Sequence, residues 1–361
     1  MRVLHVIDSL QVGGAETHLR NIIPQLRKKN IQISIYLLKS TKSFLELDIM
    51  KDRTPIYYSN RSSIYSIAHV FDLARHLRDH HYDLIHVHLF PAQLWAAMAV
   101  YLVRGKILLI TTEHNTYNRR RKSWLRPLDR WMYKQYISII AISEATANAM
   151  EQWLPELNGK ITIIPNGIPL DVFSKASPLC KSEITGNDSS PIILCIARFE
   201  AQKDHVTILK AMLSIPEAHL VLVGDGLTRT NMEAFAERLG IKGRVHFLGS
   251  RQDIPQLIKM ADIYVQSSHW EGFGLAAIEA MAGGLPIVAS RVPGLMDIIG
   301  DAGMLFEPGD YRQLAACINK LIDNHQLCLE LSEKSNNRSQ NYSIEKTADN
   351  YAVFYNKCLY Q

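Results

Sequence analysis

One stretch of the sequence, QSSHWEGFGLAAIEAMAGGLPIVAS at residues 266–290, sets two carboxylates on either side of a glycine-flanked turn. Residues 262–266 have the length and apolar character of a strand, whereas residues 275–282 favour a helix. We therefore expect Glu271 to lie in the loop and Glu279 inside the helix, among apolar residues. A carboxylate there is unfavourable unless something binds it, and a ligand rich in hydroxyl groups would suit. The alternative is a glutamate on the solvated face of an ordinary helix.

The turn itself has the composition of an anion site. Gly272 and Gly274 flank Phe273 just before Leu275, where the helix is expected to begin. Glycine can adopt positive φ angles and lets a ligand approach backbone N–H groups closely. Unpaired N–H groups at a helix N-terminus attract phosphate.

Glu-Gly-Phe-Gly-Leu, with a second glutamate eight positions after the first, resembles the signature of the retaining, nucleotide-sugar-dependent glycosyltransferases of family 4. The resemblance implies the GT-B fold, in which two Rossmann-like parallel-sheet domains face a cleft. It also implies that Glu271 and the backbone amides of residues 272–275 hold the donor sugar and that Glu279 holds the ribose. It covers nearly the whole chain and is most specific over residues 192–290.

Length and composition suit a globular protein with two domains. A chain of 361 residues can build two cores, and its apolar and charged fractions, 47% and 21%, are ordinary. The longest apolar run, residues 94–103, is far shorter than the roughly 18 residues that span a bilayer. No signal peptide is evident, because Met1-Arg2 leads directly into VLHVI, and we expect a cytoplasmic protein. Five cysteines without Cys-x-x-Cys spacing indicate neither a disulfide framework nor a zinc site.

Strand-like and helix-like segments alternate along the chain, which indicates an α/β fold with parallel sheets. The expected strands lie near residues 3–7, 31–38, 83–89, 107–111, 137–142, 161–164, 192–196, 219–223, 244–247, 262–266 and 286–289. A segment rich in Pro, Ser, Gly, Asn and Asp, residues 169–189, is the expected linker. We assign residues 1–168 to an acceptor-side domain and 190–342 to the donor domain. A closing helix over about 343–361 is implied by the resemblance to pack back on the first domain.

In such domains, ligands bind at the carboxyl ends of the strands. The loop after the first strand contains Gly13, Gly14 and Glu16, in a Gly-Gly-Ala-Glu sequence that resembles the family's first-loop motif. The resemblance places this motif against the donor phosphates, which Gly13 and Gly14 would meet, and against the acceptor, on the side of Glu16. The alternative is a glycine turn that serves packing alone. No Gly-x-Gly-x-x-Gly follows the strand, so a dinucleotide fingerprint is missing.

Four more polar residues lie within predicted strands or just after them. His86 and His88 alternate in DLIHVHLF and point the same way. A metal pair would need a third ligand, which the neighbouring sequence does not offer, so we interpret His86 as a core histidine with satisfied hydrogen bonds. His88 and His114 resemble family positions that face the cleft, and the position of His114 contacts the donor sugar in relatives. Asn166 resembles part of a Pro-Asn-Gly element at the mouth of the cleft, although a plain turn is the alternative.

Arg198 and Lys203 follow the strand at 192–196 in ARFEAQKD. Two cations in one loop can bind a diphosphate, the arginine by its fork and the lysine as a point charge. The family has this arrangement, and the alternative is a solvated pair. Gly224 closes another strand as part of a weak Gly-x-Gly pattern and is a further candidate for the donor site.

Transfer from a nucleoside diphosphate sugar leaves negative charge on the diphosphate, which Arg198, Lys203 and the amides of residues 272–275 could stabilise. The sequence contains no Asp-x-Asp, so we expect no metal and no other cofactor. Among the residues above, we expect a catalytic role for Arg198, Lys203, Glu271 and His114. The resemblance implies retention of configuration by a front-side mechanism.

The predicted function is transfer of a hexose or N-acetylhexosamine, with a UDP-sugar as the favoured donor and a glycan or polyprenyl-linked acceptor, in cell-surface polysaccharide synthesis. Three alternatives stay open. These are a GDP-mannose-dependent mannosyltransferase, a sugar-nucleotide epimerase or phosphorylase-like enzyme, and a non-catalytic nucleotide-sugar-binding protein.

Basic residues are in excess in the N-terminal half of the chain and gather in NRRRKSWLRPLDRWMYK, residues 118–134. Cations interleaved with aromatic groups can bind an anionic membrane surface. We expect such contacts from Arg119, Arg120, Arg121, Lys122 and Trp124, with the protein peripheral on the inner face of the cytoplasmic membrane. A solvated loop or an acidic soluble acceptor are the alternatives. Nothing resembles a base-stacking module, so no nucleic-acid partner is expected.

Overall fold

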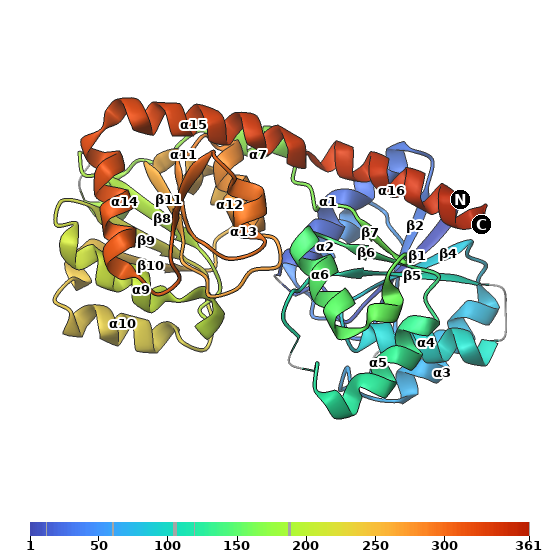
Figure 1. Cartoon of the computed structure of the whole chain (residues 1–361). Helices are drawn as coiled ribbons and strands as arrows, with labels where there is room; N and C mark the ends of the chain where they lie inside the picture. The colour runs from blue at the N-terminus through green and yellow to red at the C-terminus, as the bar shows by residue number, and fades with distance from the viewer. Residues whose placement is uncertain (12, 60, 104–106, 119, 187–188, 361) are drawn as a thin grey trace. The chain divides into compact units, whose positions relative to one another are not determined.

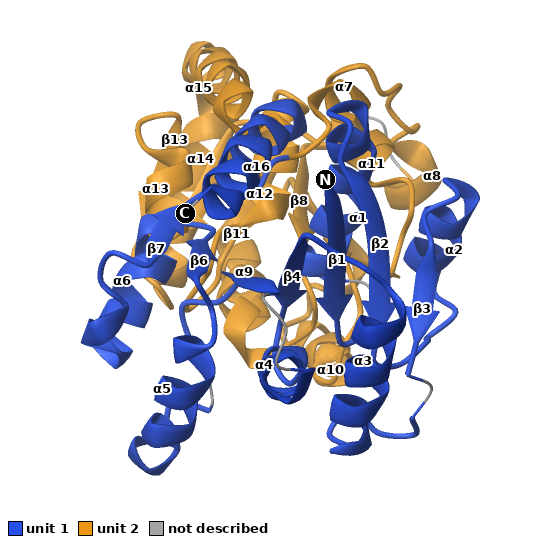
Figure 2. Ribbon diagram, turned by 90° about the vertical axis from the view of Figure 1, so that its right-hand side faces the viewer, with its two compact units in different colours: residues 1–167, 344–361 blue, residues 168–343 orange. Residues whose placement is uncertain are grey.

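The computed structural model of the chain describes residues 1–11, 13–59, 61–103, 107–118, 120–186 and 189–360. The chain divides into two compact units (Figures 1 and 2). Unit 1 comprises Met1–Gly167 and Ile344–Gln361, and unit 2 comprises Ile168–Ser343. Each unit contains one parallel sheet covered by helices, which confirms the predicted α/β class.

Unit 1 has a seven-stranded parallel sheet in the order β3-β2-β1-β4-β5-β6-β7. Its strands are β1 (Arg2–Ile7), β2 (Gln32–Leu37), β3 (Ile56–Tyr58), β4 (Leu84–His88), β5 (Leu108–Glu113), β6 (Ser138–Ala141) and β7 (Ile161–Ile163). Its helices are α1 (Gly14–Lys28), α2 (Phe44–Lys51), α3 (Ala68–Asp79), α4 (Ala92–Val103), η1 (Ser123–Leu125), α5 (Arg126–Lys134), α6 (Glu144–Trp153), η2 (Pro155–Leu157) and α16 (Ile344–Leu359).

The two faces of this sheet pack against different helices, as Figure 1 shows. Alternate residues of β1 and β4 point to opposite faces. Val6 and Val87 pack with residues of α3, α4 and α5, whereas Val3 and Leu84 pack with residues of α1, α2 and α16. By the same alternation, the polar residue His5 of β1 shares the face covered by α1 and α16.

Unit 2 has a six-stranded parallel sheet in the order β10-β9-β8-β11-β12-β13. Its strands are β8 (Ile192–Ile196), β9 (His219–Val223), β10 (Val245–Gly249), β11 (Ile263–Gln266), β12 (Ile287–Ser290) and β13 (Gly303–Phe306). Its helices are α7 (Leu170–Ser174), α8 (Ser182–Thr185), η3 (Ala201–Lys203), α9 (His205–Ala211), η4 (Met212–Ser214), α10 (Arg229–Arg238), η5 (Lys242–Arg244), α11 (Ile254–Met260), α12 (Leu275–Ala282), α13 (Leu295–Ile299), α14 (Tyr311–Asp323), α15 (His325–Ser339) and η6 (Gln340–Tyr342).

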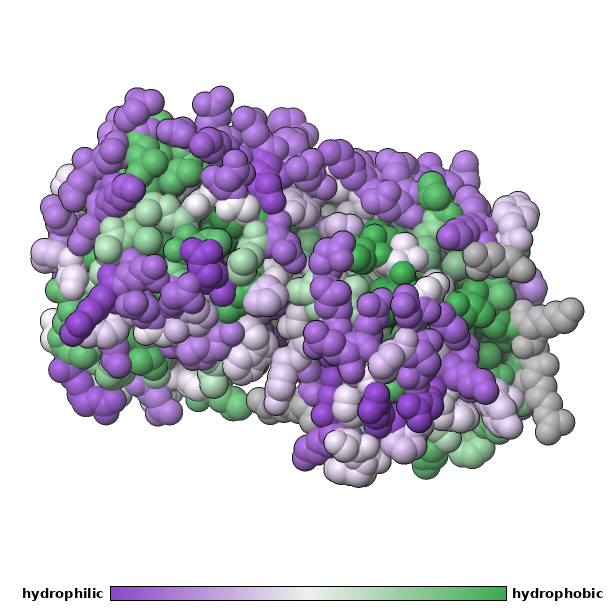
Figure 3. All heavy atoms as spheres, viewed as in Figure 1, coloured by the Kyte–Doolittle hydropathy of each residue, from purple (hydrophilic) through white to green (hydrophobic). Residues whose placement is uncertain are grey.

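Apolar residues of α9 and α14 pack with β8 and β9 in the core of unit 2. The Asp310 side chain accepts hydrogen bonds from the first backbone N–H groups of α14 and so caps it. On the face shown in Figure 3, the outer surface of α15 is mostly hydrophilic, in keeping with a helix that covers the sheet from outside.

Two features differ from the sequence predictions. The strands β3 and β13 were not predicted, because each has only three or four residues, most of them half-buried, at the edge of a sheet. Residues 169–189, expected to be a linker, belong to unit 2, where α7 packs against α11 and α12. Within the described part of the chain, no helix is both long and apolar enough to cross a membrane.

Candidate active site

The strand order of unit 2 reverses between β8 and β11, which are neighbours in the sheet. Ligands of open α/β sheets bind at such a reversal, outside the carboxyl ends of the strands. The loop after β8 carries Arg198 and Lys203, and the loop after β11 carries Glu271. The fold therefore places three of the predicted site residues on two adjacent loops.

Lys203 and Glu271 form an ion pair. The Lys203 ammonium lies 2.5 Å from the Glu271 carboxylate, and the Ser268 hydroxyl donates to the same carboxylate oxygen at 3.2 Å. The two charged side chains are only 14% and 12% exposed, so their attraction is less screened than that of a surface pair. We expected both residues in the site, but nothing in the sequence indicated that they pair with each other.

A chain of buried polar groups supports Glu271 and was not predicted. The Tyr264 hydroxyl donates to Gln266 at 2.6 Å, and the Gln266 amide donates to the Ser268 hydroxyl at 3.1 Å, which in turn donates to Glu271. Gln266 and Ser268 are 2% and 0% exposed. Two polar residues at the end of an otherwise apolar strand were the signal that could have identified them.

Arg198 lies in the same loop as Lys203 but in a different environment. Its side chain is 60% exposed, and its guanidinium lies 3.0 Å from the half-exposed carboxylate of Glu200. Exposed pairs of this kind contribute little to stability. An incoming anion can therefore replace Glu200 as the partner of the Arg198 guanidinium at a small cost in free energy.

The predicted anion loop leads directly into α12. Gly274 precedes the helix with φ 93°, a left-handed conformation that favours glycine. The Phe273 side chain is buried and packs edge-on against Tyr342, with ring centroids 5.7 Å apart. Phe273 therefore anchors the loop, and only the backbone of residues 272–275 is suited to meet a ligand.

Glu279 lies on α12 among buried apolar residues, as the sequence predicts. Burial raises the pKa of its carboxyl to about 7. Among the described residues it forms no ion pair, in contrast to Glu271. A hydroxyl-rich ligand would supply the missing hydrogen bonds.

Gly224 has a packing role. Its φ is 135°, and a Cβ atom there would lie 2.1 Å from the carbonyl oxygen of Ala197. The absence of a side chain thus lets the loop after β9 approach the backbone next to Arg198. Direct binding of the donor by Gly224 stays a prediction.

In unit 1 the corresponding reversal lies between β1 and β4. Gly13 precedes α1, which begins at Gly14, and the site of a Cβ atom on Gly13 would lie 2.4 Å from the Glu16 carboxylate. Glu16 therefore folds back over the start of its own helix. Asp8, which was not predicted, accepts a hydrogen bond from the Ala92 backbone at 2.8 Å and so caps α4. Burial, with the charge of Glu16 as a smaller cause, raises the pKa of Asp8 to about 7.

The histidines of unit 1 form a buried cluster. Both ring nitrogens of His86 form hydrogen bonds, Nδ1 with the Tyr355 hydroxyl at 2.6 Å and Nε2 with the Thr112 hydroxyl at 2.7 Å, as expected of a satisfied core histidine. His88 is only 1% exposed, so its side chain does not face a ligand directly, contrary to our expectation. Its Nδ1 lies 3.3 Å from Nε2 of His114, which is 9% exposed and follows β5.

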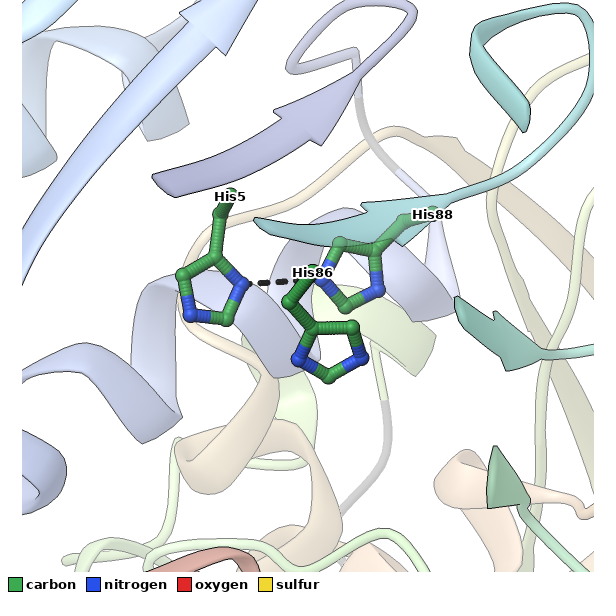
Figure 4. Close-up of side chains that lie close together, drawn as sticks. All are labelled: His5, His86 and His88. Carbon is green, nitrogen blue, oxygen red and sulfur yellow. Dashed lines mark hydrogen bonds between the residues drawn. The ribbon is translucent and has the colours of Figure 1, made fainter. Parts of the chain in front are cut away.

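His5 of β1 joins this cluster and was missed in the sequence. It is the register partner of His86, and its ring nitrogen lies 2.9 Å from that of His88 (Figure 4). One nitrogen of each of these three residues lies within 4.8 Å of the others, a spacing that could hold a metal ion. The third possible ligand is absent from the neighbouring sequence, as predicted, but the fold supplies His5 from β1, which is far away in sequence and adjacent to β4 in the sheet.

Asn166 follows β7 and is buried, with 2% of its surface exposed. Within the described chain its side-chain oxygen has no hydrogen-bond partner. A turn residue with an unsatisfied buried oxygen is compatible with the predicted binding role.

The basic segment is only partly on the surface. Arg120 lies 3.4 Å from the buried Asp129 and stacks over the Phe90 ring at 3.7 Å, while Arg121 donates to the carbonyls of Thr116 and Ala149. Both cations therefore have partners within unit 1, and a membrane contact through them stays a prediction. Lys122 and Trp124 are exposed, the latter by 73%. Arg119 lies outside the described residues.

Two family models match the chain and together cover most of it. The model described as Glycosyl transferases group 1 matches residues 181–338, and the model described as Glycosyltransferase Family 4 matches residues 12–172. The chain belongs to the glycosyltransferases of family 4, and its two parallel-sheet units have the GT-B fold.

Individual proteins are similar over most of their length. N-acetyl-alpha-D-glucosaminyl L-malate synthase of Bacillus anthracis is 29% identical over 81% of this chain and 79% of that protein. UDP-Gal:alpha-D-GlcNAc-diphosphoundecaprenol alpha-1,3-galactosyltransferase of Escherichia coli is 24% identical over 91% of this chain and 87% of that protein. Anabaena Alr3699/HepE, solved in complex with UDP and glucose, has a TM-score of 0.86 at 24% identity, covering 99% of this chain and 100% of that chain.

Proposed function

We propose that this glycosyltransferase moves a hexose or N-acetylhexosamine from a nucleoside diphosphate sugar, with UDP-sugars favoured, to a glycan or polyprenyl-linked acceptor of a cell-surface polysaccharide. The observation that carries the proposal is the arrangement at the strand reversal of unit 2. There Arg198 and the Lys203–Glu271 pair stand on adjacent loops, and the glycine turn after Glu271 opens α12.

Each group has a role in this proposal. Arg198, Lys203 and the first N–H groups of α12 stabilise the negative charge that develops on the departing diphosphate. Glu271 binds hydroxyl groups of the donor sugar, and Glu279 accepts hydrogen bonds from the ribose. Binding of the ribose would stabilise the Glu279 carboxylate and lower its pKa from about 7.

We further propose retention of configuration by front-side attack. The bond between the anomeric carbon and the phosphate oxygen breaks with its electron pair passing to the phosphate. The acceptor oxygen bonds to the same face of the sugar, and its proton passes to the departing phosphate. No metal ion is needed for these steps, because the cations and the helix N-terminus supply the positive charge.

Names and ligands of similar proteins support the choice of partners. The Escherichia coli relative is named for a UDP-sugar donor and a diphosphoundecaprenol acceptor, and Anabaena HepE was solved with UDP and glucose. A cytoplasmic location, with Lys122 and Trp124 against the inner membrane surface, belongs to the same proposal.

The test is a transfer assay with UDP-glucose, UDP-galactose, UDP-N-acetylglucosamine and GDP-mannose against a panel of polyprenyl-diphosphate sugars, with and without EDTA. We expect release of UDP, an α-linked product by NMR and unchanged rates in EDTA. GDP release from GDP-mannose alone would replace the donor assignment, an inverted product would refute the front-side step, and loss of activity in EDTA would refute metal independence.

A further inference from the structure

Three buried imidazoles form a continuous chain that ends at His114. His5 Nδ1 lies 2.9 Å from His88 Nε2, and His88 Nδ1 lies 3.3 Å from His114 Nε2. The rings of His5 and His88 are inclined by only 8° with centroids 5.2 Å apart, so one nitrogen faces the other nearly in the plane of the rings. Figure 4 shows this first contact as a dashed line.

The number of protons restricts the chain to two arrangements. Burial lowers the pKa of His5 and His114 to about 3 and that of His88 well below its usual value, so all three rings are neutral. A neutral imidazole has one N–H and one bare nitrogen, and each contact between rings needs one N–H. Either all three rings carry the proton on Nδ1, or all three carry it on Nε2.

The two ends of the chain decide between these arrangements. His5 Nε2 and His114 Nδ1 are both buried and have no hydrogen-bond partner among the described residues. His5 lies inside β1, whereas His114 follows β5 at the carboxyl edge of the sheet. A buried N–H without a partner is rarer than an unused acceptor, so the N–H belongs at the end of the imidazole chain that a ligand can reach. That end is His114, and the favoured arrangement therefore leaves a bare nitrogen on His5 and an N–H on His114 Nδ1.

We propose that His5 and His88 are positioning residues that hold His114 in the Nδ1–H tautomer, so that this N–H can donate to a sugar oxygen at the carboxyl edge of the unit 1 sheet. The contact with the sugar rests on the proposed function. The tautomer is a property of unit 1 alone and can be measured without substrate.

The rival interpretation is a metal ion held by His5, His86 and His88. Two nitrogens on one tetrahedral zinc ion, each at about 2.05 Å, lie about 3.3 Å apart. The observed 2.9 Å between His5 and His88 is the spacing of a hydrogen bond. Both nitrogens of His86 also already contact hydroxyl groups, one of which a metal would have to displace. These observations favour the proton chain.

The test is long-range ¹H–¹⁵N NMR of the full chain labelled at histidine, near neutral pH and without substrate. We expect protonated Nδ1 and bare Nε2 on His5, His88 and His114. His5→Leu should convert His114 partly to the Nε2–H tautomer, whereas His76→Asn, a buried histidine of α3 in the same unit, should leave it unchanged. Protonated Nε2 in the wild type, or an equimolar metal in the purified protein, would overturn the proposal. The wild-type spectrum decides this point even if His5→Leu fails to fold.

Activity gives the second readout. His5→Leu should lower kcat/KM by about three- to tenfold, the effect of one neutral hydrogen bond, with little change in the affinity for free UDP. Equal losses for UDP and for the sugar nucleotide would contradict the proposed contact. If the wild type transfers no sugar from any donor, the proposed function fails, but the NMR result still decides the tautomer.

Discussion

The ammonium of Lys203 lies 2.5 Å from the carboxylate of Glu271, and this pair joins the loops that follow two neighbouring strands of unit 2. The pair holds the two loops together before any ligand binds. A bound donor would offer new partners to both groups, phosphate to the lysine and sugar hydroxyls to the glutamate. Removing Lys203 therefore removes both a ligand contact and an internal contact, whereas Arg198 makes only an exposed pair.

Arg198→Ala should lower turnover by about a hundredfold, because it removes one cation from the leaving diphosphate. Its melting temperature should change little, since the side chain is 60% exposed. Initial rates of UDP release and thermal unfolding measure both effects. Arg251→Ala, which removes another exposed arginine that pairs with an acid in unit 2, is the matched control. A rate equal to that of the control would exclude Arg198 from the reaction.

Lys203→Ala should destabilise unit 2 by about 2 kcal/mol, because it leaves Glu271 largely buried without its cation. The double variant Lys203→Ala, Glu271→Gln should regain most of that stability but no activity. Urea unfolding of the two variants provides the comparison. A double variant no more stable than the single one would mean that the ion pair does not account for the loss.

Glu279→Gln should change how stability and binding depend on pH. Burial raises the pKa of Glu279 from 4.5 to about 7, so the folded chain favours the protonated form, and stability falls as pH rises from about 4.5 through 7. Because the Glu279 side chain keeps some exposure, we expect the free energy of unfolding to fall by about 1 to 2 kcal/mol in the wild type. The variant should show no such fall. UDP-glucose, which has no ionisation near pH 7, should bind the wild type about tenfold more tightly at pH 8 than at pH 6. Parallel pH profiles of wild type and variant would refute this role of Glu279.

The fold and the residues of the candidate site in unit 2 could be predicted largely from local sequence signals, and the predictions that failed did so for physical reasons. Buried strands such as β8 and β11 are apolar runs bounded by loops, and Glu279 is conspicuous as a charge in an apolar helix. The pairing of Lys203 with Glu271, and of His5 with His88, depends on which strands become neighbours. Arg120 and Arg121 have the composition of a surface segment, but Arg120 stacks on Phe90 and Arg121 donates to the Ala149 carbonyl, and both of these partners come from other parts of unit 1.

Lys122→Ser combined with Trp124→Ser should reduce binding to vesicles that contain anionic lipid. Both residues are exposed, so the loss should be a few-fold, with about 1 kcal/mol from the cation. Sedimentation with anionic and neutral vesicles, at low and high salt, measures it. Lys51→Ser combined with Tyr65→Ser, at exposed sites elsewhere in unit 1, is the control. Equal pelleting of the two double variants would remove the membrane proposal and leave the transferase assignment intact.

Calorimetric titration of the full chain with UDP and with GDP tests the donor site most directly, because it requires no knowledge of the acceptor. UDP should bind, and Glu279→Ala should weaken this binding by about ten- to a hundredfold, the effect of a lost charge-assisted hydrogen bond to the ribose. Arg198→Ala should also bind UDP more weakly than the wild type does. If neither nucleotide binds, or if both variants bind UDP as tightly as the wild type does, the donor site is not at the strand reversal of unit 2.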